Sequence, residues 1–510
     1  MLVIGLDGAT PNLLFRLVRQ GYLKNLQKMM ATGSYGKLMS TIPPATCPAW
    51  VSSVTGVNPG KHGIHDFFLS LDIKKRNFDF ANSTKRKTKA IWNILSDAGK
   101  ETVILNVPVT YPPEKVNGVM VSGVLTPSLH SNFTYPKKAK DDLLNLGYQV
   151  DLGETMLEKT LAFEENKTKM LYALERLIEK RLVAAEFFMK RYDWNFFMVV
   201  FVALDRIQHF FWRYIDSEHA AYEAQEAQYF FPHILKVFKK LDDSIGRLVT
   251  GAGEDVNTLI YSDHGFKSLN TFFFTNNLLR KKKLLRIRKK SASSVISQDF
   301  IIKKIVDFGL DNLVRKVPTG LKRRTGMFLR PSKGVIDIFD LSIESKTFQF
   351  GNGFIKINRE TVSTPEEYEK VRDEIIRLFN EELVHGTLFR AYKKDEAYHG
   401  KHIKNIPDII LVSRKDALSS QLIPTNGLQF MDYDEKTRIP SLMWNGQHDQ
   451  YGIIICSGPN LKRGYDIKNA NILDITPTIL KILREPIPDY MDGKILDCVN
   501  KYDSSTSGVN

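Results

Sequence analysis

The sequence predicts an α/β protein with a mostly parallel central sheet covered by helices. Short apolar runs alternate with longer amphipathic stretches, which is typical of strands joined by helical crossovers. Three of these runs lead directly into polar clusters, at Asp7, at Asp205 and at Ser262–Gly265. Because ligands bind outside the carboxyl ends of parallel strands, we expect these polar residues to converge at one edge of the sheet.

Length and composition fit a large folded protein. The 510 residues are 43% hydrophobic and 25% charged, which argues against a disordered, collagen-like or coiled-coil chain. The three cysteines, Cys47, Cys456 and Cys498, are too few and too scattered for a disulfide framework, so we expect a reducing, cytoplasmic location. The first residues read as a strand rather than a signal peptide, and Phe196–Leu204, the longest apolar run, is too short to span a bilayer.

The individual elements follow from the same pattern. Strands of the central sheet are expected at Leu2–Leu6, Glu101–Leu105, Phe196–Leu204, Asn257–Tyr261, Asp408–Val412 and Gly452–Cys456. Helices are expected within Pro136–Arg191 and over Pro365–Leu383, and a further strand over Phe348–Ile357. We therefore expect a core made of residues 1–266 and 405–497, an inserted domain over 267–404 and a flexible tail over 498–510.

Asp and His residues gather at the predicted strand ends. Asp205 and His209 are four residues apart at the start of a helix, so both side chains fall on one face and can bind one metal ion. The other members of the set are Asp7, Asp263, His264 and His448. Six oxygen and nitrogen ligands without a thiolate suit two hydrolytic metal ions, with zinc as the first expectation and manganese as a substitute. Asp7 or Asp205 alone could be a helix N-cap, but the joint occurrence of all six residues favours a site.

Thr46 is the candidate nucleophile. It follows a proline-stiffened loop, Ile42–Ala45, and opens an apolar helix, so its hydroxyl would lie at the positive helix end where an anion docks. The local alternative is that Thr46 caps the helix. Cys47 is the rival nucleophile, but no base or redox partner is near it in the sequence, so we interpret it as a packing residue.

These motifs, in this order, resemble the alkaline phosphatase superfamily, and most closely its type I phosphodiesterase and nucleotide pyrophosphatase branch with the related predicted phosphohydrolases and phosphomutases. The resemblance rests on Asp7, on Thr46 followed by Thr55-Gly56 and His62-Gly63-Ile64, on Asp205-x-x-x-His209, on Asp263-His264-Gly265 and on Gly446-x-His448. It covers roughly Met1–Phe266 and Asp408–Leu496, and it implies a three-layer α/β catalytic core with an inserted cap domain.

The resemblance also implies roles for these residues. One zinc ion would be held by Asp205, His209 and His448, and a second by Asp7, Asp263, His264 and the hydroxyl of Thr46. Thr46 would attack phosphorus and form a phospho-threonine intermediate. The implied reaction is hydrolysis of a phosphodiester or pyrophosphate bond in a phosphorylated small-molecule or nucleotide-like substrate. A phosphomonoesterase or phosphomutase of the same superfamily is the alternative.

Comparison with sister branches narrows this reading. A sulfatase requires Cys or Ser at the nucleophile position and Arg four residues later, where this chain has Thr46 and Trp50, and the phosphoglycerate mutases use Ser. Nucleotide pyrophosphatases usually carry an Asn further along after the Thr, which binds a phosphate oxygen, but Asp66 stands in that stretch here. Lys61 and Asn106 are the candidates to replace that donor.

The positive charge is concentrated in one segment. Net charge is +15, and Arg280–Lys333 contains seventeen Lys and Arg against three Asp. A basic amphipathic segment of this kind can lie on an anionic membrane surface or bind a polyanionic substrate, and we expect a cap over the metal site; a solvated cap helix is the alternative. Nucleic-acid binding is disfavoured because no recognised module is present. A basic polyanion- or membrane-binding protein on an inactive hydrolase scaffold is the alternative from outside enzymes, and no oligomeric state follows from the sequence.

Overall fold

A computed structural model describes residues 1–152, 167–288, 335–382, 388–434 and 443–500. Its centre is a nine-stranded sheet with the strand order β22-β2-β21-β9-β1-β8-β5-β6-β7. The strands are β1 (Leu2–Leu6), β2 (Ser34–Met39), β5 (Thr102–Leu105), β6 (Gly118–Val121), β7 (Thr134–Tyr135), β8 (Phe196–Phe201), β9 (Thr258–Tyr261), β21 (Tyr451–Ser457) and β22 (Tyr465–Asn471). Five neighbouring strands, from β9 to β6, are parallel, which confirms the predicted fold class.

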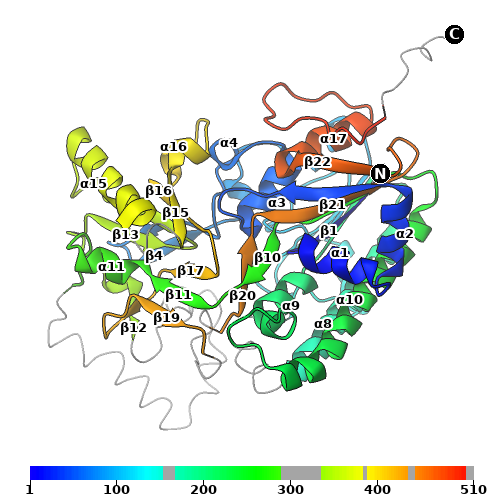
Figure 1. The fold of residues 1–510 in the computed structure, drawn as a ribbon. Helices are drawn as coiled ribbons and strands as arrows, with labels where there is room; N and C mark the ends of the chain where they lie inside the picture. The colour runs from blue at the N-terminus through cyan, green and yellow to red at the C-terminus, as the bar shows by residue number, and fades with distance from the viewer. Residues whose placement is uncertain (153–166, 289–334, 383–387, 435–442, 501–510) are drawn as a thin grey trace, which may run out of the picture.

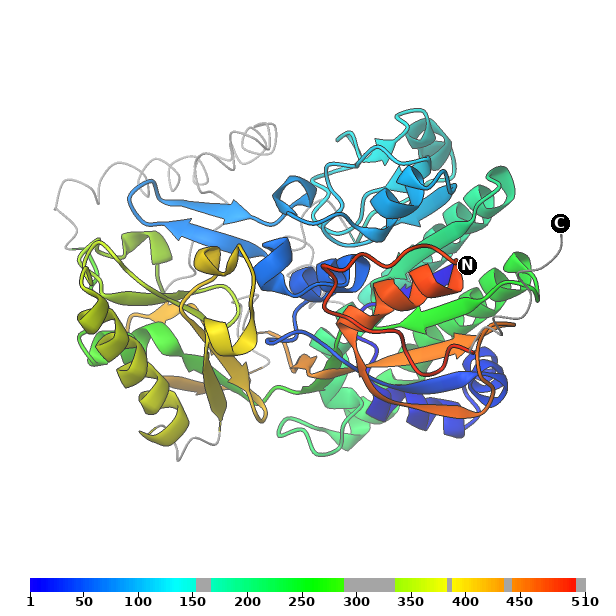
Figure 2. The ribbon, with the colours of Figure 1, turned by 90° about the horizontal axis from the view of Figure 1, so that it is seen from above.

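Helices cover both faces of this sheet (Figures 1 and 2). On one face α10 (Ala224–Ala252) packs against α8 (Lys167–Arg191) and α2 (Lys24–Thr32). On the other face α17 (Ile475–Ile482) packs against α3 (Thr46–Thr55). The remaining helices of this part are α1 (Pro11–Arg19), α4 (Pro59–His62), α5 (Ile91–Asp97), α6 (Ala139–Asn145) and α9 (Ala203–Phe211). The central strands are buried on both faces, as parallel strands covered by helices are.

A second, smaller body lies beside the first and has its own hydrophobic cluster (Figure 1). It contains a four-stranded sheet in the order β13-β14-β16-β15 and a three-stranded sheet in the order β17-β11-β19. Its elements are β11 (Thr271–Phe274), α11 (Thr275–Lys281), β13 (Thr347–Phe350), β14 (Phe354–Ile357), α15 (Pro365–Arg377), β15 (Phe389–Lys393), α16 (Lys394–Ala397), β16 (Ile409–Ser413), β17 (Ala417–Ser420) and β19 (Phe430–Asp432). The hairpin of β3 (Phe68–Asp72) and β4 (Asn77–Phe80) also packs on this cluster.

Three of the expected elements need correction. The strand expected at Asp408–Val412 exists as β16, but it pairs with β14 and β15 rather than with the central sheet, because Ile409 and Leu411 pack in the second cluster. The run Phe348–Ile357 is two strands, since Gly351 and Gly353 have positive φ angles and form the turn between them. The apolar run Phe196–Leu204 is a strand only to Phe201, and helix α9 begins at Ala203.

The predicted helices are present within the described residues, with different bounds. Helix α15 begins at Pro365 behind Thr364, whose hydroxyl accepts the N–H of Glu367, and it ends at Arg377 rather than Leu383. The stretch Pro136–Arg191 contains α6 and α8, and residues 153–166 lie outside the described part. The division into a core over 1–266 and 405–497 and a cap over 267–404 stays a prediction.

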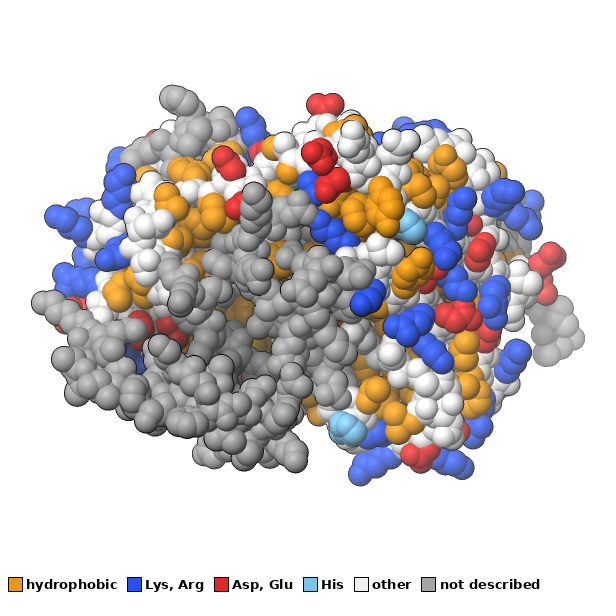
Figure 3. Space-filling model, turned by 90° about the horizontal axis from the view of Figure 1, so that it is seen from below, with side chains coloured by type: hydrophobic (Ala, Val, Ile, Leu, Met, Phe, Trp, Pro, Cys, Tyr) orange, Lys and Arg blue, Asp and Glu red, His pale blue; other side chains and the backbone are white. Residues whose placement is uncertain are grey.

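Most of the basic segment, residues 289–334, lies outside the described residues, so the expected membrane or polyanion contact of Arg280–Lys333 stays a prediction. In the described part of the face in Figure 3, Lys and Arg side chains lie among acidic and hydrophobic ones. Among the described residues, no helix is long and apolar enough to cross a membrane.

Candidate active site

The polar residues that follow three neighbouring strands lie at one edge of the sheet. Asp7 follows β1, Asp263 and His264 follow β9, and Asp205 lies in the first turn of α9 after β8. Strand β1 pairs in parallel with both β8 and β9, so the carboxyl ends of all three strands meet. Gly8 has a φ of 75°, and a Cβ atom there would lie 2.6 Å from the ring of Phe266, so the turn after Asp7 requires glycine.

His448 reaches this edge through a separate strand pair. Strand β20 (Gly446–Asp449) runs antiparallel to β10 (Gly265–Ser268), in a register that places His448 opposite Phe266. The rings of His448 and His264 therefore stack, with their centroids 3.6 Å apart. The two segments are far apart in the sequence, and this short ladder is what brings them together.

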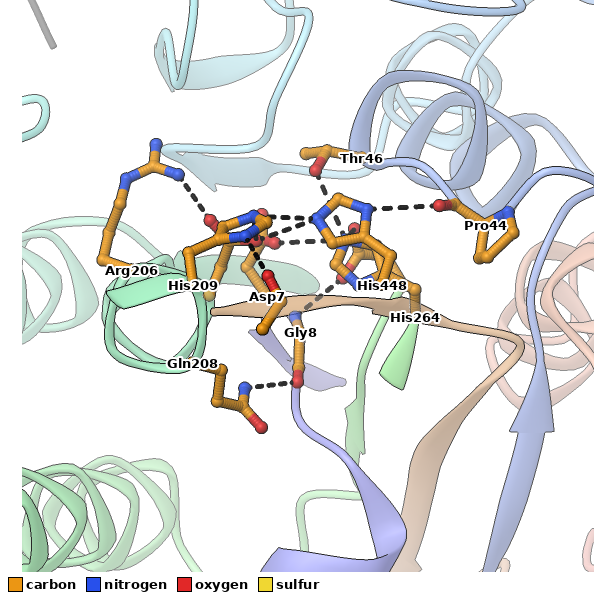
Figure 4. Close-up of polar contacts among 12 residues, drawn as sticks. Asp7, Gly8, Pro44, Thr46, Arg206, Gln208, His209, His264 and His448 are labelled. Carbon is orange, nitrogen blue, oxygen red and sulfur yellow. Dashed lines mark hydrogen bonds and ion pairs between the residues drawn. The ribbon is translucent and has the colours of Figure 1, made fainter. Parts of the chain in front are cut away.

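The six expected ligands form two groups, each of which places three ligand atoms within 4.8 Å of one another. In the first group, Asp205 Oδ1 lies 3.3 Å from the Nε2 atoms of both His209 and His448. In the second, His264 Nε2 lies 3.2 Å from Asp263 Oδ2 and 3.7 Å from Asp7 Oδ1. Figure 4 shows Asp7, His209, His264 and His448 turned toward one another. The grouping matches the two sets that the resemblance implies.

Backbone carbonyls orient the three imidazole rings. The Nδ1 atoms of His209, His448 and His264 lie 2.9, 3.1 and 3.1 Å from the carbonyl oxygens of Gly446, Pro44 and Gly265. A neutral ring that donates from Nδ1 keeps its lone pair on Nε2, which is the arrangement of metal-binding histidines. The Nε2 atoms of His209 and His448 are only 3.1 Å apart, so two lone pairs face one region of space.

The buried carboxylates need a cation. Asp7 Oδ1, Asp205 Oδ1 and Asp263 Oδ2 are buried and, when the neighbouring rings carry their protons on Nδ1, accept no hydrogen bond from any residue that the structure describes. Burial raises the pKa of Asp7 and of Asp263 well above the usual range, and repulsion between neighbouring carboxylates adds to it. Burial would also raise the pKa of Asp205, but His209 and Arg206 hold it well below the usual range. Unpaired carboxylate oxygens beside imidazole lone pairs fit divalent metal ions.

Thr46 is not a helix cap. It is the first residue of α3, and the N-cap position belongs to Ala45, whose side chain makes no capping hydrogen bond. Its hydroxyl oxygen lies 3.3 Å from Nε2 of His264, and only 6% of the residue is exposed. The hydroxyl therefore faces the second ligand group at the positive end of a helix, where an anionic group is stabilised.

Residues that the sequence did not single out hold the ligands in place. The indole N–H of Trp50 donates to Asp7 Oδ2 at 3.1 Å, and the Gln208 amide donates to the carbonyl of Gly8 at 2.7 Å. Arg206 pairs with both Asp205 and Asp151. Only their positions in the sequence could have pointed to Trp50 and Arg206. Trp50 is four residues after Thr46 on one helix, and Arg206 is next to Asp205.

We expect Trp50→Phe to weaken the binding of a divalent metal ion by roughly tenfold to a hundredfold, because outer hydrogen-bond partners orient metal ligands. Competition with a chromogenic chelator measures the affinity. Trp92→Phe is the matched control, since Trp92 is a buried tryptophan whose indole contacts Glu114 instead. Equal losses in both variants would contradict the role given to Trp50.

The structure does not bring Lys61 or Asn106 to the ligand groups through any contact among the described residues. The Lys61 ammonium pairs with Asp492 and donates to the carbonyl of Tyr490 at 2.8 Å. The Asn106 amide is buried after β5 and donates to the carbonyl of Val200 at 3.2 Å. The Lys61 charge is thus paired and one of the two Asn106 N–H groups is used, and their phosphate-binding role stays a prediction.

Asp66 has a structural role in the site's surroundings. Its buried carboxyl accepts N–H groups from Phe67 at 2.8 Å and from Asn352 at 3.0 Å, which ties the loop after α4 to the β13–β14 turn. Burial raises its pKa from 3.8 to about 7. The folded protein therefore keeps a proton there that the unfolded chain releases at lower pH.

Asp66→Asn should change the pH dependence of stability. Above the unfolded pKa of Asp66, the unfolded chain releases its proton while the folded protein keeps it. The free energy of unfolding is therefore highest below the unfolded pKa and falls as pH rises toward the folded pKa. Between pH 4 and pH 8 we expect wild type to lose about 4 kcal/mol relative to Asp66→Asn, given pKa values of 3.8 and about 7. Urea denaturation across this range measures it, and parallel pH curves would contradict it.

Fold and site together define a phosphate-ester hydrolase of the alkaline phosphatase superfamily. A sequence model described as type I phosphodiesterase / nucleotide pyrophosphatase matches residues 1–423, so the chain belongs to that family. A search of curated proteins found no match.

Solved structures share the fold. Human ectonucleotide pyrophosphatase/phosphodiesterase 5 has a TM-score of 0.54 and 13% identity, over 98% of this chain and 99% of that chain. Phosphonoacetate hydrolase from Sinorhizobium meliloti 1021, bound to phosphonoformate, has a TM-score of 0.57 and 14% identity over 93% of each chain. The murine ectonucleotide pyrophosphatase/phosphodiesterase 5, as an inactive threonine-to-alanine variant in complex with AMP, has a TM-score of 0.52 and 12% identity over 96% of each chain.

Proposed function

We propose that this protein hydrolyses a phosphodiester or pyrophosphate bond in a nucleotide-like substrate, with Thr46 as the nucleophile. The observation that carries this proposal is the position of the Thr46 hydroxyl, buried at the N-terminus of α3 and 3.3 Å from His264. The alternative role of Thr46 as a helix cap has no support, because Ala45 occupies the N-cap position and the Thr46 hydroxyl contacts His264.

Two divalent metal ions, zinc first and manganese as the substitute, fit the two ligand groups. Asp205, His209 and His448 would hold one ion, and Asp7, Asp263, His264 and the Thr46 hydroxyl would hold the other. Such ions lower the pKa of a bound hydroxyl and offset negative charge on phosphoryl oxygens. The three unpaired carboxylate oxygens and the Nε2 lone pairs are the observations that support this fit.

The chain's own part in the reaction has two steps. In the first, a bond forms between Thr46 Oγ and phosphorus, the bond to the leaving oxygen breaks, and the hydroxyl proton leaves to solvent. In the second, a water oxygen bonds to phosphorus and Thr46 Oγ is released and reprotonated. The N–H groups at the start of α3 would favour the negative charge of a phosphoryl group bonded to Thr46.

The nucleotide-like substrate rests on similarity. The murine relative was solved in complex with AMP as an inactive variant, in which one threonine is replaced by alanine. For the compartment we propose the cytoplasm, because Cys47, Cys456 and Cys498 are buried free thiols.

A paired assay tests the proposal. Purified protein is analysed for metal content and assayed with a chromogenic phosphodiester and with its monoester. We expect about two zinc or manganese ions per chain and faster turnover of the diester. Monoester preference with the same metals would replace the proposal with a phosphomonoesterase or phosphomutase. Absence of both metal and turnover would leave the inactive binding scaffold as the better account.

A further inference from the structure

A cavity lies between the two bodies of the protein and outside the metal-ligand groups. Its volume is about 780 Å³, within the usual range for small-molecule sites, which often form where two bodies meet. The walls come from the loop after α4, the β3–β4 hairpin, β14, the start of α15 and the segment from Lys394 to Asp408. Neither Thr46 nor any of the six ligand residues is among its described lining residues.

The lining is strongly basic. Its cationic side chains are Lys85, Lys87, Lys356, Arg359, Lys394 and Lys404, and its acidic ones are Asp79 and Asp408. The two acids are already engaged, Asp79 with Lys85 and Asp408 with Lys394, each at 2.9 Å. Arg359 stacks on the ring of Tyr368.

Three lysines remain available. Lys87, Lys356 and Lys404 form no ion pair with any residue that the structure describes, although they line one cavity. Lys87 and Lys404 are exposed and Lys356 is half-buried, and all three positive charges would attract an anion bound in the cavity.

His65 is a buried polar group in the cavity wall. The residue lines the cavity and is only 1% exposed, yet neither of its ring nitrogens has a hydrogen-bond partner. Burial, together with the charge of Lys356, lowers its pKa to about 3, so the ring is neutral at physiological pH. A neutral ring carries one N–H donor, but both ring nitrogens are shielded from solvent, so an anion would accept from it only after the surrounding side chains move.

We infer that this cavity is a second anion-binding site, which takes a small ligand with several phosphate or sulfate groups. The ligand should carry more than one anionic group, because three lysines of the lining form no ion pair with a described residue. Enclosure by elements of both bodies fits a small molecule better than a nucleic acid, which needs an open basic track. A ligand here would contact both bodies at once and stabilise their contact.

Binding of pyrenetetrasulfonate to the metal-loaded full chain tests this inference. The probe is a fluorescent tetra-anion that carries no phosphate ester and cannot be hydrolysed. We expect the double variant Lys356→Glu with Lys404→Glu to weaken binding by about tenfold or more. The matched control, Lys24→Glu with Lys468→Glu, changes two exposed lysines outside the cavity and produces the same change in net charge.

The outcomes separate this site from the metal centre. Selective loss in the cavity variant, with binding unchanged in Asp205→Asn, supports the inference. Equal weakening in the cavity variant and its control would show attraction to overall charge, and loss in Asp205→Asn would place the probe at the metal centre; either result, or no binding at all, would overturn it. The inference does not depend on the proposed reaction, because binding is read without turnover.

Discussion

Replacing Thr46 with alanine should abolish phosphodiester turnover, by roughly a thousandfold or more, while the metal content stays at the wild-type level. The reason is that the variant removes the only proposed nucleophile and leaves all six imidazole and carboxylate ligands in place. Steady-state kinetics with a chromogenic diester, and elemental analysis of the same sample, measure both quantities.

Two further variants sharpen this test. Thr46→Ser keeps a hydroxyl at the same position and should retain measurable turnover. Thr55→Ala is the matched control, because Thr55 lies at the other end of α3 and its hydroxyl donates only to the carbonyl of Val51 at 2.7 Å. If Thr46→Ala kept turnover close to that of Thr55→Ala, Thr46 could not be the nucleophile.

His209→Ala should lower the metal content from about two ions per chain to about one and reduce diester turnover by roughly a hundredfold or more. His209 lies beside Asp205 and His448 in one ligand group, and its loss leaves two ligands there, while the group of Asp7, Asp263 and His264 stays complete. Chelator treatment of wild type should remove turnover, and adding back zinc or manganese should restore it.

His130→Ala is the control for a histidine outside both groups, since His130 is exposed. It should keep two ions and full turnover. If His209→Ala kept both metal ions, His209 would not be a metal ligand, even if the activity fell. Added metal should also raise the unfolding temperature of wild type more than that of His209→Ala, because a ligand that binds only the folded state stabilises it.

Several features were accessible from the sequence because they are local. The apolar runs of β1, β8 and β9 and the polar residues that end them predicted a mostly parallel sheet with a site at its carboxyl edge. The four-residue spacing of Asp205 and His209 placed both on one helix face. The order and the residue types of the motifs then identified the family, and the family model that matches residues 1–423 confirms it.

Other features depend on contacts between distant segments. The strand β16 has the same apolar character as a core strand, and only its partners β14 and β15 assign it to the smaller sheet. Lys61 was a candidate phosphate donor by position, but its pairing with Asp492, far along the chain, engages its charge elsewhere. The hydrogen bond from Trp50 to Asp7 likewise joins a helix to a strand end.

The sequence by itself determined the fold class, the family and the residue types of the site, because hydrophobic periodicity and motif spacing are properties of short stretches of chain. Only the tertiary structure decided that His448 stacks on His264, that buried carboxylate oxygens remain unpaired between the imidazoles, and that unpaired lysines share a cavity with His65. Burial and charge pairing arise when distant segments meet, so they are set by packing and not by local pattern.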